Sequence, residues 1–255
     1  MEEPVISGQN GSGTVFFAHC NLGCIYCQNY KISAQQSHGR KTEPEELAEK
    51  MLMLQEQKAE NINFVTPTHY QPLVIRSCEI AKKRGLKIPI VYNTGGFENV
   101  EQIKELCGTV DIFLTDLKYY SPYYSALYSK CEDYFDFASA ATEQMIAQTG
   151  KCTYYKSGML KSGVIIRHLM LPYLLHDTLQ IIRYVGENFK DTALFSLMRQ
   201  YTPVCPDLPP ELNRVINDNE YKTAVCALEE YGLEGFIQDS SATGSDKIPV
   251  WETDF

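Results

Sequence analysis

Short runs of apolar residues recur along the chain, and Val, Ile and Phe dominate most of them. Such runs are too short for amphipathic helices and are typical of strands that are buried on both faces. The runs lie at 14–18, 62–66, 88–92, 111–115, 164–169 and 193–197, with a weaker seventh at 235–238. We therefore predict six short strands and a weaker seventh.

Stretches with helical periodicity separate these runs. Residues 42–45 (Thr-Glu-Pro-Glu) fit a capping box that opens a helix, and Gly85 is placed to end a second helix over 72–84. Three further helices are predicted at 98–107, 175–188 and 210–231. Strands that alternate with helices indicate an α/β fold with a parallel sheet, either an open doubly wound sheet or a full or partial (β/α) barrel.

One segment departs from this alternation. Residues 118–160 are rich in Tyr, and the pattern predicts two helices there with a loop near Gly150. We interpret the segment as an insertion within one barrel. No linker or internal repeat divides the chain, so we expect a single domain over residues 1–255.

Composition excludes several classes of function. The chain carries 23 Lys and Arg against 32 Asp and Glu, a formal charge of −9, which argues against a nucleic-acid-binding surface. No apolar run approaches the roughly 18 residues of a membrane span, and the N-terminus does not read as a signal peptide. The nine cysteines are therefore expected to be thiols or metal ligands in a cytoplasmic protein.

The strongest chemical signal is a cysteine loop directly after the first predicted strand. Cys20, Cys24 and Cys27 follow a C-x3-C-x2-C spacing, and Gly23 allows a tight turn between them. Three thiolates at this spacing can hold three corners of an iron–sulfur cubane and leave the fourth iron open for chemistry. A zinc site that uses His19 with the same cysteines is the alternative, but no second C-x2-C supports it.

The cysteine loop resembles the signature of the radical SAM superfamily, including the aromatic Tyr26 before the third cysteine. The longer phrases at 11–30, 61–69, 116–119 and 167–172 resemble an uncharacterised branch related to pyruvate formate-lyase activating enzyme. The resemblance covers nearly the whole chain. It implies a partial TIM-type (β/α)6 barrel that binds a 4Fe–4S cluster at Cys20, Cys24 and Cys27 together with S-adenosylmethionine (SAM).

Polar residues follow several predicted strands, at the edge where a parallel barrel places its active site. The resemblance implies that Lys118 and Arg167 position the SAM carboxylate and ribose, with Asp116 beside them, and that the Tyr26 backbone meets the adenine. Related activating enzymes hold a monovalent cation at positions that match Asn93, Thr94 and Asp116.

Two sets of residues leave alternatives open. The family generally has a Gly-Gly-Glu stretch after its second strand to receive the SAM amino group. This chain has residues 66–69 (Thr-Pro-Thr-His) there, and we expect Thr66 and Thr68 to act as replacement acceptors. His69 and His168 are candidate acids or bases, or hydrogen-bonded structural residues.

The expected activity follows from this resemblance. The protein would cleave SAM reductively to a 5′-deoxyadenosyl radical and abstract a hydrogen atom, with activation of a glycyl-radical enzyme or modification of a peptide or small molecule as the outcome. An electron donor such as flavodoxin or ferredoxin is the expected partner. The alternative from another class is an electron carrier without SAM chemistry, although such carriers normally use four cysteines.

Overall fold

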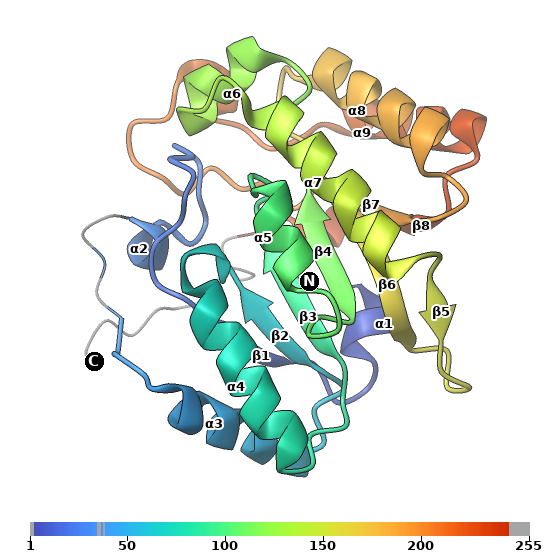
Figure 1. Cartoon of the computed structure of the whole chain (residues 1–255). Coiled ribbons are helices and arrows are strands. Elements are labelled where there is room, and N and C mark those ends of the chain that lie inside the picture. The colour runs from blue at the N-terminus through green and yellow to red at the C-terminus, as the bar shows by residue number, and fades with distance from the viewer. Residues whose placement is uncertain (1–2, 35–36, 38, 245–255) are drawn as a thin grey trace.

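A parallel β-sheet forms the centre of the fold, as the alternation of strands and helices predicts (Figure 1). The computed structural model describes residues 3–34, 37 and 39–244 of the chain. The parallel strands are β1 (Gly13–Phe16), β2 (Ile62–Val65), β3 (Ile90–Thr94), β4 (Ile112–Asp116), β6 (Leu160–Leu169), β7 (Leu194–Met198) and β8 (Gly235–Ile237). They lie side by side in the order β1-β2-β3-β4-β6-β7-β8, and the short β5 (Thr153–Tyr154) pairs antiparallel with β6.

The sheet does not close. In the described part of the chain β1 pairs only with β2, and β8 pairs only with β7, so the barrel is open between its first and last strands. This confirms a partial TIM-type barrel. The six predicted strands are all present, and the weaker seventh run forms the edge strand β8.

Helices cover the outer face of the sheet (Figure 1). They are α3 (Pro44–Glu56), α4 (Gln71–Lys83), α5 (Val100–Glu105), α7 (Tyr134–Thr149), α8 (Leu175–Asn188) and α9 (Asp218–Tyr231). Four shorter elements are α2 (Tyr30–Ser33) and the 3-10 helices η1 (Thr68–Tyr70), η2 (Pro210–Leu212) and η3 (Ser240–Ala242). The Tyr-rich segment contains α6 (Pro122–Ser129) and α7, and α7 is the helix that connects β4 to β6 across the outer face.

Several helix starts differ from the sequence prediction, and one of them is α5, which begins at Val100 instead of residue 98. The N-cap of α3 is Glu43, not Thr42, and it makes no side-chain capping bond, because Pro44 already supplies the first helical position. The predicted helix over 210–231 is broken into η2 and α9. A capping box at Asn217 and Glu220 starts α9 afresh, since the Asn217 side chain accepts from the backbone N–H of Glu220.

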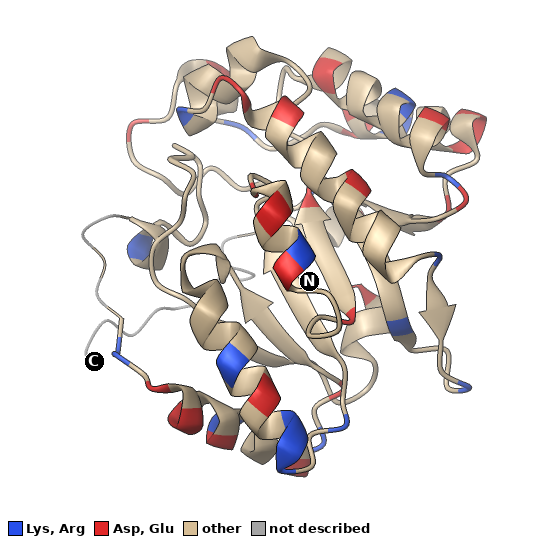
Figure 2. Cartoon of the chain, viewed as in Figure 1, with Lys and Arg blue, Asp and Glu red and all other residues tan. Residues whose placement is uncertain are grey.

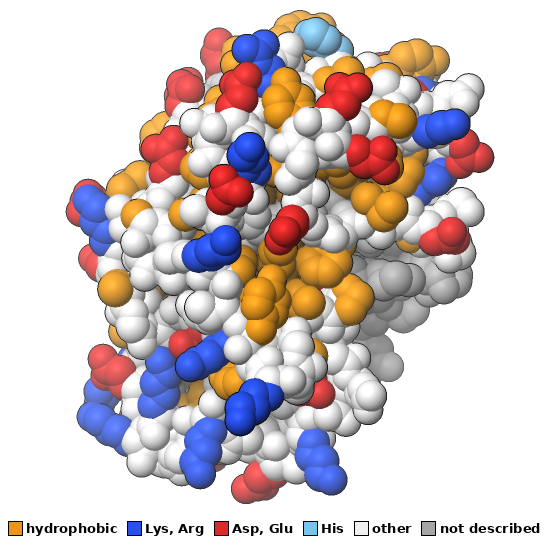
Figure 3. Space-filling model, turned by 90° about the vertical axis from the view of Figure 1, so that its right-hand side faces the viewer, with side chains coloured by type: hydrophobic (Ala, Val, Ile, Leu, Met, Phe, Trp, Pro, Cys, Tyr) orange, Lys and Arg blue, Asp and Glu red, His pale blue; other side chains and the backbone are white. Residues whose placement is uncertain are grey.

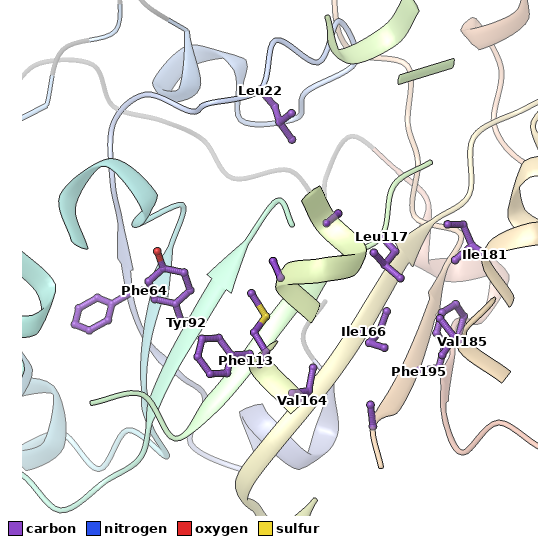
Figure 4. Close-up of a cluster of buried hydrophobic side chains, with 14 of the residues drawn as sticks. Leu22, Phe64, Tyr92, Phe113, Leu117, Val164, Ile166, Ile181, Val185 and Phe195 are labelled. Atoms are coloured by element: carbon purple, nitrogen blue, oxygen red, sulfur yellow. The ribbon is translucent and has the colours of Figure 1, made fainter. Parts of the chain in front are cut away.

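The hydrophobic core has two layers because strand side chains alternate between the two faces of the sheet. On the outer layer Phe64, Tyr92 and Phe113 pack beside Val164, and Ile181 of α8 packs on the same cluster (Figure 4). The inner layer lies inside the barrel and contains Ile6, Val91, Ile112, Leu114, Leu160, Ile165 and Leu194. The short helix α1 (Pro4–Ser7) therefore plugs the barrel with Ile6.

Charges of both signs are interspersed along the helices that cover the sheet (Figure 2). On the side of the molecule that carries β5 and β8, hydrophobic side chains gather between scattered charges (Figure 3), and Ile237 of β8 is largely exposed. No helix in the described residues is both long and apolar enough to span a membrane.

Candidate active site

A cavity of about 370 Å³ opens at the carboxyl ends of the parallel strands, beneath the cysteine loop. This size is within the range of small-molecule and cofactor sites. Ten of the eleven side chains that the sequence analysis assigned to the cluster, to SAM or to a cation line it: Cys20, Cys24, Tyr26, Cys27, Thr66, Asn93, Thr94, Asp116, Lys118 and Arg167. Thr68 is not among the lining residues.

The cysteine loop is held in place by distant parts of the chain. The backbone N–H of Gly23 donates to Ser129 O at 3.2 Å, and that of Ile25 donates to Tyr128 O at 2.9 Å. The ring of Tyr26 is buried and packs edge-on against Tyr201. These contacts attach the loop to the end of α6 and to the segment after β7. They therefore fix the positions of the three thiols at the cavity.

Each of the three sulfurs has a hydrogen-bond partner. Cys20 Sγ accepts from the backbone N–H of Leu22 at 3.4 Å, and Cys27 Sγ shares a hydrogen bond with Ser33 Oγ at 3.3 Å. Ser129 Oγ donates to Cys24 Sγ at 2.9 Å. Hydrogen bonds to ligand sulfurs are one of the means by which proteins set the potential of an iron–sulfur cluster.

The hydroxyl that reaches Cys24 belongs to a buried chain of hydroxyl groups. Tyr119 Oη lies 2.8 Å from Ser129 Oγ, and Tyr119 Oη donates to Tyr26 Oη at 2.7 Å. No local sequence pattern indicates Ser129 or Tyr119, because their proximity to the cysteine loop depends on contacts about a hundred residues apart along the chain.

Lys118 is the cation that faces the thiols. Burial raises the pKa of Cys20 and raises that of Cys24 to about 11, while the Lys118 ammonium acts in the opposite direction on both. Burial by itself lowers the pKa of Lys118, but the carboxylate of Asp116 and the Cys24 sulfur outweigh it and hold that pKa well above its ordinary range. The lysine therefore keeps its positive charge beside the sulfurs.

Asp116 and Lys118 form an ion pair at the end of β4, and Tyr134 of α7 fixes the backbone around it. The Tyr134 hydroxyl lies 2.7 Å from Asp116 O and 2.8 Å from Gly95 O, and it accepts from the backbone N–H of Lys118 at 3.0 Å. This hydroxyl joins the carboxyl ends of β3 and β4, which positions the ion pair at the cavity wall.

The carboxyl end of β2 is strained. Thr66 lines the cavity with a φ of 58°, a left-handed conformation that is uncommon for β-branched residues. The Thr68 hydroxyl instead donates to Glu98 Oε1 at 2.6 Å, and Thr94 donates to the same oxygen. The two threonines proposed as acceptors are therefore placed differently, one at the cavity and one on a buried carboxyl group.

Glu98 is a buried acid that sequence reasoning missed. Only 2% of the residue is exposed, and this burial raises its pKa to about 7, although the hydrogen bonds from Thr68 and Thr94 act in the opposite direction. The one sequence feature that could have indicated Glu98 as a site residue is its position just after the Gly95-Gly96 turn that ends β3. The carboxyl group links the ends of β2 and β3.

The raised pKa gives a prediction for stability. The folded state holds the Glu98 proton more tightly than the unfolded chain does. The stabilisation is therefore complete below the ordinary value of 4.5 and is lost as the pH rises through about 7. Glu98→Gln has no ionisable group at this position, so the variant does not lose this stability as the pH rises. Relative to the parent, the variant should gain roughly 2–3 kcal/mol between about pH 5 and about pH 8.

Thermal unfolding of both proteins at these two pH values measures the gain. Glu101→Gln, which changes an exposed carboxylate nearby, provides the control and should show no such trend. An equal difference between Glu98→Gln and the parent at both pH values would show that Glu98 is ionised throughout.

The two histidines lie outside the cavity. His168 follows Arg167 on β6 and therefore points to the opposite face, where its ring nitrogens bond Leu117 O at 2.6 Å and Thr178 Oγ1 at 2.9 Å. Burial lowers its pKa to about 4, so it is a neutral structural residue at physiological pH. His69 is exposed on η1 and does not line the cavity.

Among the described residues, no three His, Cys, Asp or Glu side chains are close enough together to hold a single metal ion. His19 ring nitrogens bond Tyr70 Oη at 3.2 Å and Ser37 O at 3.0 Å, away from the thiols. The three cysteines line one cavity, and His19 does not line it with them. The other cysteines of the described chain do not line the cavity.

Comparison with known proteins gives both a family and a fold. The profile of the radical SAM superfamily matches residues 14–147. An uncharacterised protein of Methanocaldococcus jannaschii is 29% identical over 233 residues, which are 88% of this chain but only 63% of that protein. The chain thus spans less than two thirds of the length of this curated relative.

Solved structures extend the similarity of the fold. SuiB of Streptococcus suis, in a crystal structure with bound S-adenosylmethionine, has a TM-score of 0.57 at 12% identity, over 90% of this chain and 51% of that one. A domain of pyruvate-formate lyase-activating enzyme from Bacteroides vulgatus has a TM-score of 0.50 at 11% identity, over 68% of this chain and 94% of that domain. At these identities the similarity concerns the fold alone.

Proposed function

Because the chain belongs to the radical SAM superfamily, we propose that Cys20, Cys24 and Cys27 hold a 4Fe–4S cluster and that the protein cleaves SAM reductively. Membership of the superfamily implies an iron–sulfur cluster and SAM, and the assignment to these residues is our own. When bound, cluster and SAM together supply a 5′-deoxyadenosyl radical that takes a hydrogen atom from the substrate.

The observation that carries this proposal is the convergence of three thiols on one cavity that also contains the Asp116–Lys118 pair. In the described chain no fourth cysteine lines the cavity, so the donor set fits a cluster with one iron open to SAM. Lys118 provides positive charge beside the thiolates, and Tyr26 with Leu22 encloses the loop from the core side. Enclosure excludes water from the reacting groups.

The test is product analysis. Anaerobically reconstituted protein, reduced with dithionite and given SAM, should release methionine and 5′-deoxyadenosine in equal amounts. An iron–sulfur electron carrier would be reduced but would release neither product. Binding of zinc without colour would contradict both assignments.

We propose further that the substrate is a protein, as in the activation of glycyl-radical enzymes, and that a small carrier such as flavodoxin or ferredoxin delivers the electron. The lack of pairing between β1 and β8 in the described part of the chain supports a large substrate, since the cavity is lined in part by β1 at that open edge. A glycine Cα would lose its hydrogen atom to the radical and keep the unpaired electron. Electron paramagnetic resonance of the incubated substrate protein would detect that glycyl radical, whereas turnover only with small molecules would contradict this proposal.

The lysine of the cavity gives a sharper prediction. Lys118→Met keeps the length of the side chain but removes the cation, so SAM should bind about ten- to a hundredfold more weakly through loss of a charge-assisted hydrogen bond. Equilibrium binding of SAM measures the loss, and iron content should stay nearly intact. Lys104→Met, which removes an exposed ion pair with Glu101, is the matched control. Unchanged SAM affinity in Lys118→Met would place this lysine outside the SAM site.

A further inference from the structure

The carboxylate of Glu3 is buried at the floor of the cavity, and it belongs to residues 3–7, the N-terminal plug, whose Ile6 fills the inside of the barrel. Glu3 precedes α1 and is 4% exposed, and its Oε1 lies 3.4 Å from Arg167 Nε. Arg167 lines the cavity, whereas Glu3 does not. The ion pair therefore joins the segment inside the barrel to the side chain that faces the ligand space.

The plug fixes the position of Glu3 independently of this ion pair. Glu3 O accepts from the backbone N–H of Ile6 and of Ser7, which closes the turn of α1. Ile6 is buried in the inner core layer, and the Asn61 side chain donates to Ile6 O at 2.9 Å. The backbone that carries the Glu3 carboxylate is consequently held in place beside Arg167.

Arg167 is the cation that pairs with Glu3. The second carboxylate oxygen, Oε2, is buried and has no hydrogen-bond partner among the described residues. A buried carboxylate without other donors requires a paired cation, because burial of an isolated charge is very unfavourable. The pairing also cancels the charge of the guanidinium at the cavity floor.

The guanidinium still presents donors to the cavity. Arg167 Nη1 donates to Asn93 Oδ1 at 3.3 Å, and Nη2 lies 3.4 Å from Met198 Sδ, a weak acceptor. A ligand oxygen can replace the thioether as the partner of Nη2. Arg167 can therefore donate hydrogen bonds to a ligand at the cavity floor, while the carboxylate of Glu3 already offsets its positive charge.

We infer that Glu3 is a positioning residue of the active site, which orients Arg167 and prevents the cavity floor from binding a free anion. This inference rests on the proposed function, because it assigns Glu3 to the SAM site through Arg167. The inference implies that the site selects among anions. A ligand carboxylate binds through its hydrogen bonds to Arg167 and its placement in the site, whereas small free anions do not compete for Arg167.

The test uses sodium formate as the anionic probe. In Glu3→Gln the guanidinium loses the carboxylate that pairs with its Nε, so formate should bind at the cavity floor. The apparent dissociation constant of SAM should then rise about tenfold with formate present. In the parent protein formate should change it little. A role of Glu3 in folding alone would not produce sensitivity to formate.

Two variants make the result specific. Glu3→Gln combined with Arg167→Gln should lose the formate sensitivity, since the guanidinium that would bind the anion at the cavity floor is then absent. Glu60→Gln removes a carboxylate that binds Asn10 near the same plug and should behave like the parent. A Glu3→Gln protein that binds SAM like the parent and ignores formate would overturn the inference.

Failure to fold is also informative. If Glu3→Gln is insoluble, the double variant should fold again, because it removes both buried charges. A double variant that is no more stable than Glu3→Gln would overturn the pairing. A parent protein that binds no SAM at all would overturn the proposed function instead, which separates the two outcomes.

Discussion

Cys24→Ala should abolish SAM cleavage. Cys24 lines the cavity, and among the thiols of the described chain only Cys20 and Cys27 line it as well. Two remaining thiolates do not hold a cubane that leaves one iron open, and the reconstituted variant should contain far fewer than the about four irons expected of the parent. Iron analysis and release of 5′-deoxyadenosine measure both effects.

Cysteines elsewhere in the fold supply the controls for this experiment. Cys78 is buried in α4, and Cys226 is exposed on α9, and neither lines the cavity. Cys226→Ala should cleave SAM at the parental rate, and Cys78→Ala should do so at temperatures where it remains folded. Full turnover by Cys24→Ala would contradict the cluster assignment.

Gly96→Ala should destabilise the fold by roughly 3–5 kcal/mol. Gly96 has a φ of +87°, and a Cβ there would overlap the carbonyl oxygen of Asp116 and lie 2.8 Å from the Tyr134 hydroxyl. The substitution therefore combines a left-handed conformation with a backbone clash in a rigid region, and the two costs add. Because Asp116 has to move, the ion pair with Lys118 should be disturbed as well.

Gly85 is the matched control for this glycine. Its φ is +104°, but an added Cβ would meet nothing within 4 Å. Gly85→Ala should cost only the conformational part, about 1 kcal/mol. Thermal unfolding of the two variants measures the difference, and equal losses would show that the approach of Asp116 to Gly96 is unimportant.

Local patterns were sufficient to predict the framework of this protein. The strand runs and α8 follow directly from apolar periodicity, and the site at the strand ends follows from parallel topology. Helix starts were less predictable. The motif at 42–45 fits a capping box, yet Pro44 makes Glu43 the N-cap, whereas the functioning box at Asn217 lies inside a stretch that was predicted as continuous helix.

The unpredicted parts of the site share one physical cause. Glu3, Glu98 and Ser129 act through contacts with residues that are far away in sequence or across the sheet, and no local pattern encodes such contacts. Alternation along a strand was a usable but overlooked signal. Arg167 and His168 are neighbours on β6, so only one of the two can face the cavity.

The order of synthesis sets the time at which the contacts that hold the thiols can form. Cys20, Cys24 and Cys27 leave the ribosome before Ser129, which follows about a hundred residues after Cys24, and Cys205, whose sulfur donates to Cys27 O, follows later still. Domains emerge from the N-terminus first, at several residues per second. During that interval the nascent loop carries three cysteines without these partners, so the contacts that hold the three thiols in place are complete only after residue 205 has been made.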